Sequence, residues 1–64
     1  MAYKKLFCYD GPVYDGTVIY TRIKVYCHAY TKLQAISIIA GNINKDAGRK
    51  GLWLDQQYMK EETK

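Results

Sequence analysis

Residues 31–48 constrain the fold most, because they carry the start, the end and the apolar face of one amphipathic helix. The hydroxyl of Thr31 can cap the first turn, and Gln34 completes the capping-box pattern. Gly48 can adopt the left-handed conformation that closes a helix. The apolar side chains recur at the spacing of a single buried face: Ala35, Ile36, Ile39, Ala40, Ile43 and Ala47. We therefore predict a helix over residues 31–47 whose formation depends on packing that face.

Residues 17–29 form the longest predicted strand, and their side chains alternate in character. Because successive side chains of a strand point to opposite faces, residues 19–30 divide into two sets. One set is small and apolar: Ile19, Thr21, Ile23, Val25, Cys27 and Ala29. The other set is aromatic or basic: Tyr20, Arg22, Lys24, Tyr26, His28 and Tyr30. We expect the helix to cover the apolar set and solvent to meet the other, with a bend or a bulge in so long a strand.

A first strand is predicted over residues 3–9, which are rich in aromatic residues. The Asp-Gly-Pro sequence at residues 10–12 has turn chemistry and is expected to end this strand. Asp15-Gly16 is a second turn sequence, of the kind found in tight hairpins. The first two strands are therefore expected to pair antiparallel through a connection that spans residues 10–16.

A third strand is predicted over residues 52–58, and a polar tail over residues 59–64. Trp53 is expected in the core, where its ring would seal the helix against the sheet. The order strand, strand, helix, strand indicates one α+β domain, in which the helix packs on one face of a small antiparallel β-β-α-β sheet. A domain of 64 residues buries little surface, so self-association would add stability.

The composition excludes several classes of protein. Two cysteines, Cys8 and Cys27, are too few for a disulfide scaffold and lack metal-ligand spacing. We expect two buried thiols, with a single cross-strand disulfide as the alternative. The sequence shows no export signal and no apolar run long enough to span a membrane, so a cytoplasmic protein is expected. The formal charge of +4 weakly favours an acidic partner such as nucleic acid.

Catalytic motifs are missing from the sequence, and we predict a protein that is not an enzyme. The one histidine, His28, follows Cys27, and neighbours on a strand point to opposite faces, so these two cannot act as a base and a nucleophile. The glycines match neither a phosphate-binding loop nor a dinucleotide fingerprint. No cluster of histidine, cysteine and carboxylate predicts a zinc site, so neither a metal nor a cofactor is expected.

The candidate functional surface is the aromatic and basic side of the second predicted strand. Aromatic rings interleaved with cations on an exposed sheet can stack on bases while the cations contact phosphates. A second basic group lies at the end of the helix and would extend this surface if it lay beside the sheet. The candidate nucleic-acid-binding residues are Tyr20, Arg22, Lys24, Tyr26, Lys45, Arg49 and Lys50.

Two alternatives remain open for these residues. Tyrosine, arginine and lysine are ordinary residues on the solvent side of an antiparallel sheet, where cross-strand pairs of rings and cations stabilise it. The basic group after the helix can likewise serve only to complement the negative end of the helix. The same face, or an unpaired strand edge, could instead bind another protein or a second copy of the chain. The partners considered are thus DNA or RNA, a protein and a homodimer, and no membrane is expected.

Two short motifs connect the chain to other sequences. Residues 7–13 are FCYDGPV, which fits an aromatic-x-Tyr-Asp-Gly-Pro-Val pattern, and residues 29–35 are AYTKLQA, which fits an Ala-x-Ser/Thr-x-x-x-Ala helix start. Over roughly residues 3–54 the chain resembles short proteins of prophages and conjugative transposons of clostridial bacteria. This resemblance implies an accessory protein of a mobile genetic element and no particular activity. Those proteins carry more basic residues in the helix than residues 36–43 do here.

Overall fold

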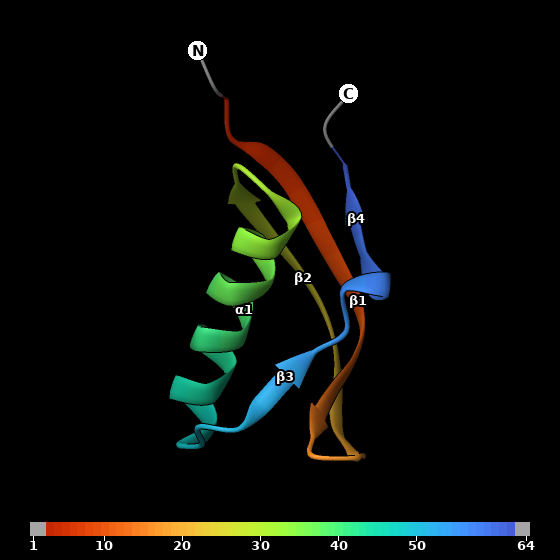
Figure 1. Ribbon diagram of the computed structural model, residues 1–64, viewed down its shortest axis with the longest axis vertical. Helices are drawn as coiled ribbons and strands as arrows, with labels where there is room; N and C mark the ends of the chain where they lie inside the picture. Colours follow the sequence, from red (N-terminus) through yellow and green to blue (C-terminus); the bar gives the residue numbers. More distant parts are fainter. Residues whose placement is uncertain (1–2, 63–64) are drawn as a thin grey trace.

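The computed structural model describes residues 3–62 and contains an antiparallel sheet of four strands with one α-helix packed against it (Figure 1). This architecture confirms the predicted α+β fold class. The elements are β1 (Lys5–Asp15), β2 (Val18–Ala29), α1 (Lys32–Ala47), β3 (Leu52–Leu54), the 3-10 helix η1 (Gln56–Tyr58) and β4 (Met59–Glu61). No helix within residues 3–62 has the length and apolar character needed to cross a membrane.

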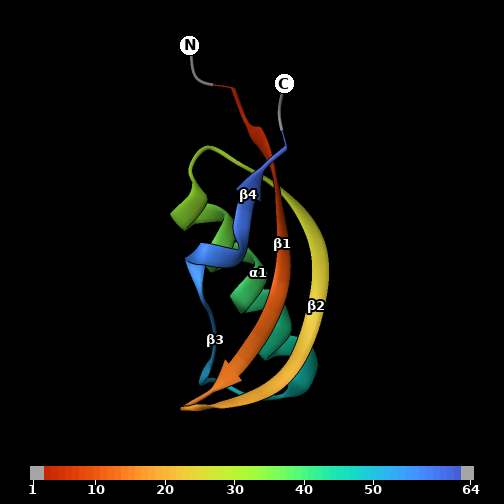
Figure 2. The same cartoon turned by 90° about the vertical axis from the view of Figure 1, so that its right-hand side faces the viewer.

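β1 is the central strand of the sheet. It pairs antiparallel with β2 along one edge, and with β3 and β4 along the other edge. The two short strands contact different parts of β1, because β3 pairs with residues 13–15 and β4 with residues 7–9. β2 consequently forms an outer edge of the sheet along its 12 residues. Figure 2 shows how β1 and β2 curve together around the helix.

β1 is longer than predicted, because the chain does not turn at residues 10–12. Gly11 and Pro12 remain extended and pair with β2 in unbroken register. No strand in the described part of the chain pairs with residues 10–12 on the side of β3 and β4, and a sheet accommodates proline at such a position. A Cβ at Gly11 would lie 2.6 Å from Cγ of Tyr58, so the glycine permits close packing. The Asp-Gly-Pro sequence at residues 10–12 therefore continues β1 and packs against Tyr58 instead of forming a turn.

The hairpin turn consists of Gly16 and Thr17. Asp15 pairs with Val18 across the turn, and Gly16 has a positive φ of 66°. A tight two-residue connection therefore follows Asp15, as expected, with Gly16 at its first central position, where a positive φ favours glycine. The longer connection predicted over residues 10–16 is wrong, because β1 continues through most of it.

β2 contains a bulge at Tyr20, as expected for a strand of its length. Val13 pairs with Thr21, whereas Tyr14 pairs with Ile19, so Tyr20 has no direct partner on β1. One extra residue reverses the alternation of side chains beyond it. Ile19 therefore lies on the same side of the sheet as Tyr14 and is 50% exposed, so its predicted place under the helix is wrong.

The hydrophobic core lies between α1 and the side of the sheet that curves around it. It receives buried residues from the helix and from all four strands: Phe7, Tyr9, Val13, Ala29, Ala35, Ile39, Leu52, Leu54 and Met59. Tyr9 is fully buried, and its hydroxyl donates a hydrogen bond to the carbonyl of Pro12 at 2.5 Å and accepts one from the amide of Asp55 at 3.2 Å. Burial raises the pKa of Tyr9, because the phenolate would lose its hydration.

Both ends of α1 carry the caps that the sequence predicts. Oγ1 of Thr31 accepts a hydrogen bond from the amide of Gln34 at 3.1 Å. Oε1 of Gln34 accepts one from the amide of Tyr30 at 2.6 Å, so the capping box reaches back one residue further than usual. At the other end, Gly48 has a φ of 67° and its amide bonds the carbonyl of Lys45 at 3.3 Å. The helix is thus closed by a left-handed glycine.

The strand predicted over residues 52–58 and the tail predicted over residues 59–64 are both wrong in their bounds. β3 ends early because η1 follows it, and the carboxylate of Asp55 caps η1 by accepting a hydrogen bond from the amide of Gln57 at 3.1 Å. The chain then returns to β1 as β4, and burial of Met59 gives this short strand a place in the core. The last two residues of the predicted tail lie outside the described residues.

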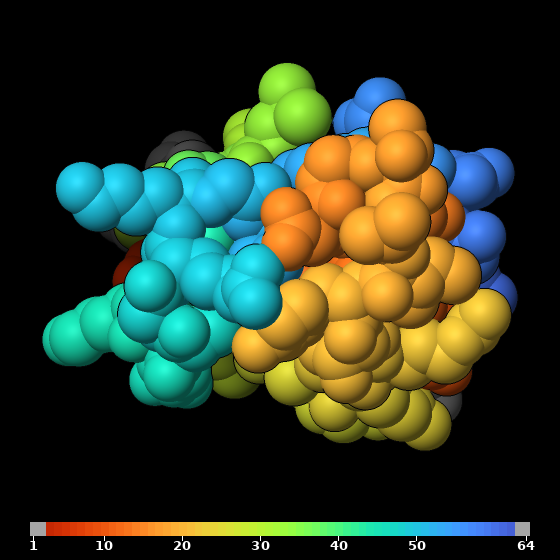
Figure 3. Space-filling model, turned by 90° about the horizontal axis from the view of Figure 1, so that it is seen from below, coloured from red at the N-terminus to blue at the C-terminus, as the bar shows by residue number. Residues whose placement is uncertain are grey.

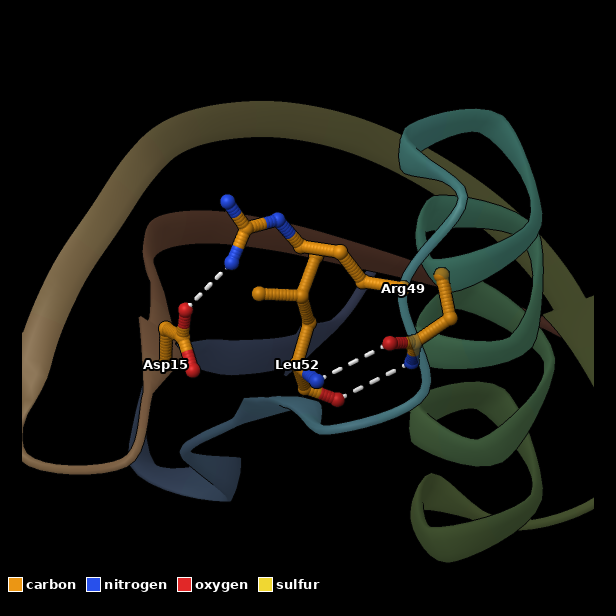
Figure 4. Close-up of polar contacts among 4 residues, drawn as sticks. Asp15, Arg49 and Leu52 are labelled. Atoms are coloured by element: carbon orange, nitrogen blue, oxygen red, sulfur yellow. Dashed lines mark hydrogen bonds and ion pairs between the residues drawn. The ribbon is translucent and has the colours of Figure 1, made fainter.

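Side-chain contacts fix the loop between α1 and β3. The side-chain amide of Asn44 accepts a hydrogen bond from the N–H of Leu52 at 2.9 Å and donates one to its carbonyl at 3.0 Å, as a neighbouring strand would (Figure 4). Arg49 forms an ion pair with Asp15 at the end of β1, with Nη1 2.6 Å from Oδ2. The loop and the hairpin are thus held together at one end of the molecule, which Figure 3 shows from below.

Candidate nucleic-acid interface

The side of the sheet that faces away from α1 is here named the open face. Direct cross-strand partners lie on the same side of a sheet. Tyr9 and Val25 are partners that belong to the core or pack against it, so the residues one position along face the other way. The open face is formed by Leu6, Cys8, Asp10, Pro12 and Tyr14 of β1, by Ile19, Arg22, Lys24, Tyr26 and His28 of β2, by Trp53 of β3 and by Lys60 of β4.

The alternation predicted for β2 is confirmed over residues 22–29. The residues on the helix side are half-buried against the core or fully buried: Ile23, Val25, Cys27 and Ala29. The residues on the other side are exposed: Arg22, Lys24, Tyr26 and His28. Residues 18–21, near the hairpin turn, are all exposed whichever way they point. The aromatic and basic side of β2 is therefore shorter than predicted.

Three candidate residues, Arg22, Lys24 and Tyr26, follow one another along the open face. The side chain of Tyr26 is 58% exposed. Within residues 3–62 neither Arg22 nor Lys24 forms an ion pair, so both cations are accessible to an anionic ligand. Asp10, the cross-strand partner of Lys24, brings one negative charge to the same face. The strand thus presents two cations and an exposed ring in a row.

A hollow of about 260 Å³ lies beside Tyr26 on the open face. Its lining is mostly polar and comes from β1, β2, η1, β4 and the residue after β4: Cys8, Asp10, Lys24, Tyr26, Gln57, Tyr58, Lys60 and Glu62. Tyr26, Cys8 and Lys60 are successive cross-strand partners, so Lys60 adds a third cation to this surface. Lys60 is not among the predicted site residues, because residues 59–64 are expected to form a polar tail.

The two cysteines are both free. Cys8 pairs with Tyr26 on the open face, whereas Cys27 pairs with Phe7 on the helix side. Because their side chains point to opposite sides of the sheet, this structure excludes the disulfide that was considered as an alternative. The expectation of two small buried thiols holds for Cys8, which is 5% exposed, while Cys27 is half-buried.

Trp53 does not lie in the core, in contrast to the prediction. Leu52 and Leu54 are buried, so the alternation of the strand directs Trp53 to the open face, where it is 45% exposed. Its ring stacks on that of Tyr14, with the centroids 4.5 Å apart, and its Nε1 donates a hydrogen bond to the carbonyl of Gly16 at 3.0 Å. The Leu-Trp-Leu sequence could have indicated this, because a strand covered on one side buries only alternate residues.

Tyr14 connects Trp53 to the basic part of the open face. Partial burial raises the pKa of Tyr14 and the nearby Tyr58 acts in the same direction, whereas the positive charge of Arg22 opposes both. This influence agrees with the register, in which Arg22 pairs with Pro12, two residues before Tyr14. The stacked pair and the cations therefore form one continuous surface.

The remaining candidate residues lie outside the open face. Cζ of Arg49 is 4.8 Å from the centre of the Tyr20 ring, and the same guanidinium pairs with Asp15. The bulge thus directs Tyr20 to a separate cluster with Arg49 and Asp15 at the hairpin end of the molecule. Lys45 and Lys50 are exposed on the last turn of α1 and in the loop that follows it. The structure therefore brings only three of the candidate residues together on the open face.

No three histidine, cysteine or carboxylate side chains of the described part of the chain gather where they could share a metal ion. Comparison of the chain with protein-family models, with curated proteins and with solved structures finds no match. The geometry of the open face is therefore the main basis for assigning a function. It combines exposed cations, exposed rings and a polar hollow, which η1 borders, on the side of the sheet opposite α1.

Proposed function

We propose that this chain is a non-enzymatic, cytoplasmic accessory protein of a mobile genetic element and that it binds nucleic acid through the open face. The observation that carries this proposal is the row of exposed side chains Arg22, Lys24 and Tyr26 on the sheet face opposite α1. The mobile-element context is supported by the two motifs at residues 7–13 and 29–35.

Phosphate contacts from Arg22, Lys24 and Lys60 would supply most of the binding free energy. Each cation that neutralises a phosphate releases a condensed counterion, and the logarithm of the affinity falls with the logarithm of the salt concentration, with a slope of about −0.7 per contact for a single strand. For these cations together the slope is about −2, so the affinity is expected to fall roughly 20-fold between 50 and 200 mM salt. Asp10, beside Lys24, offsets part of the attraction, so the affinity at physiological salt is expected to be modest.

Fluorescence anisotropy of a labelled oligonucleotide over a salt series tests this proposal. The variant with both Arg22→Ala and Lys24→Ala can no longer neutralise two of the phosphates, so its salt dependence is expected to fall to a slope of about −0.7. Both side chains are exposed, so the substitutions leave the core unchanged. The decisive quantity is the change in slope, because the slope is proportional to the number of phosphates that the protein neutralises.

The matched control carries Lys45→Ala and Lys50→Ala. This variant loses the same two positive charges from exposed positions outside the open face, so its affinity and slope should stay near those of the wild type. Equal losses of affinity in the two double variants would show that binding follows net charge alone. The proposal is refuted if neither DNA nor RNA is retained at low salt.

A second candidate function, self-association, is favoured by the outer edge of β2. Within residues 3–62 this edge has no strand partner, and a hollow of about 280 Å³ lies between β2 and α1. Antiparallel pairing of two copies about Val25 would place Lys24 of one copy opposite Tyr26 of the other on the open face, a favourable pair of a cation and a ring. On the other side, Ile38 lines the hollow and is 41% exposed, which offers the second copy an apolar contact.

The mass of the protein in solution, measured by light scattering over a range of concentrations, tests self-association. A dimer that dissociates on Ile38→Asp, with an unchanged circular dichroism spectrum, would support it. Ser37→Asp is the control, because it adds the same charge at an exposed neighbouring position that does not line the hollow. A monomer at every concentration contradicts this candidate. Salt should affect an apolar contact far less than it affects binding to phosphates.

A further inference from the structure

We infer that the ligand of the open face is single-stranded nucleic acid, whose bases stack on Trp53 at one end of the face and on Tyr26 at the other. This inference rests on the proposed function, and it adds the class of nucleic acid and a binding residue that the sequence had placed in the core. Trp53 is 45% exposed, so part of its ring is accessible to a ligand. A tryptophan side chain is usually buried in the core, so its exposure on the open face suggests that it contacts a ligand.

The indole ring of Trp53 is held in one orientation before any ligand binds. Its Nε1 donates a hydrogen bond to the carbonyl of Gly16 at 3.0 Å. One face of the indole stacks on Tyr14, with the ring planes 23° apart. The remaining exposed surface can receive a base, which would extend this pair to a stack of three rings. Because the indole is already oriented, binding costs little additional conformational entropy.

Trp53 and Tyr26 mark the two ends of the binding surface. Their cross-strand partners on β1 are Tyr14 and Cys8, whose positions lie roughly 20 Å apart at ~3.3 Å per residue. A stacked single strand has one phosphate per ~3.4 Å and an extended one has fewer, so the surface takes at most about six nucleotides. The cations of β2 lie between the two rings, along the path that phosphates joining the two stacked bases would follow.

A duplex fits this surface less well than a single strand does. In a duplex the faces of the bases are covered by the neighbouring base pairs, and proteins recognise it by hydrogen bonds to base edges in the grooves. Stacking on Trp53 and Tyr26 needs unpaired bases, whereas phosphate contacts are available in both forms. Since every base has a face that can stack, little sequence preference is expected.

Trp53 is the only tryptophan of the chain, so its fluorescence reports directly on this part of the surface. The wild-type protein is titrated with a mixed-sequence oligonucleotide of about 16 nucleotides, alone and annealed to its complement. Anisotropy of the labelled DNA gives the affinities independently. The single strand is expected to quench the emission of Trp53 and to bind about tenfold more tightly than the duplex. Stacking of a single base on an aromatic ring is enough to give this difference in affinity.

Variants then locate the stacking. Trp53→Ala is expected to weaken binding of the single strand about tenfold, and Trp53→Phe less, because a phenyl ring can still stack. Tyr3→Ala is the matched control, because it removes an aromatic ring that is 78% exposed and lies outside the strands. If Trp53→Ala alters the circular dichroism spectrum, Tyr26→Ala tests the second ring in the same assay.

The failure of this inference can be distinguished from the failure of the proposed function. Equal affinity for the two forms of DNA, or unchanged affinity of the Trp53 and Tyr26 variants, overturns the stacking of a single strand. The proposed function still stands in that case if the variant with Arg22→Ala and Lys24→Ala binds more weakly than the wild type. Absence of binding to both forms of DNA and to RNA at low salt overturns both.

Discussion

Replacing Gly11 with alanine is expected to destabilise the protein by about 2 kcal/mol, although alanine is usually the better residue inside a strand by ~0.5–1 kcal/mol. The added Cβ would lie 2.6, 2.7 and 2.8 Å from Cγ, Cβ and Cδ1 of Tyr58. These atoms are close to the backbone, so η1 itself has to move. Overpacking of this kind costs ~1–3 kcal/mol. The movement also disturbs the edge-to-face contact of Tyr58 with Tyr9, whose ring centroids are 6.3 Å apart, a contact worth about 1 kcal/mol.

Urea unfolding and thermal melting measure this effect. A loss of about 2 kcal/mol lowers the melting temperature of a domain of this size by about 10 °C. Gly41→Ala is the control, because no neighbouring atom of the described residues lies within 4 Å of its added Cβ, and it should stabilise α1 by up to ~1 kcal/mol. In a Tyr58→Gly background, which removes the opposing atoms, Gly11→Ala should cost nothing. If Gly11→Ala costs the same in both backgrounds, the contact with Tyr58 is not its cause.

Three further predictions concern the polar contacts of the fold. Asn44→Ala removes both hydrogen bonds to the backbone of β3 and should cost about 2–3 kcal/mol in urea unfolding, whereas Asn42→Ala at an exposed position of the same helix should cost less than ~0.5 kcal/mol. Burial raises the pKa of Tyr9 above its ordinary value of 10.0, so the unfolded state releases this proton first and stability declines as the pH rises above about 10. The urea midpoint of the wild type should therefore fall more between about pH 8 and about pH 11 than that of Tyr9→Phe, and equal falls would contradict this. Arg49→Ala breaks an exposed ion pair with Asp15 and should cost less than ~1 kcal/mol, and high salt should reduce that cost.

The helix could be predicted closely because the interactions that define it are local. The cap at Thr31 depends on a residue three positions away, and the closing turn at Gly48 depends on the last turn of the helix. The buried face follows from spacing alone, since Ala35 and Ile39 are one turn apart. None of these features needs a partner elsewhere in the chain.

The bounds of the strands depend on residues that are distant in the sequence, and the predictions fail there. Asp-Gly-Pro at residues 10–12 has the composition of a turn, and only the packing of Tyr58 against Gly11 gives the glycine a different use. β4 is polar apart from Met59, and it is a strand because β1 offers it an edge. Backbone pairing of this kind leaves little trace in the sequence of a three-residue strand.

Only part of the candidate site could be predicted, because the register between strands depends on residues that are distant in the sequence. Alternation along β2 correctly placed Arg22, Lys24 and Tyr26 on one exposed side. It failed at Tyr20, because the position of a bulge depends on the register between two strands. It also could not place Lys60, whose position depends on the pairing of β4.

The bulge in β2 separates the cluster of Tyr20, Arg49 and Asp15 from the cations of the open face, and the two groups have different roles. The bulge directs Tyr20 to the guanidinium of Arg49. The same guanidinium forms the ion pair with Asp15, so both residues lie at the base of the hairpin turn. The carbonyl of Gly16, the next residue, orients the indole of Trp53. Two residues that the sequence grouped with the nucleic-acid contacts therefore hold the turn that positions an exposed ring. The cations that remain on the open face are those without an ion pair in the described residues, and phosphate binding needs cations of that kind.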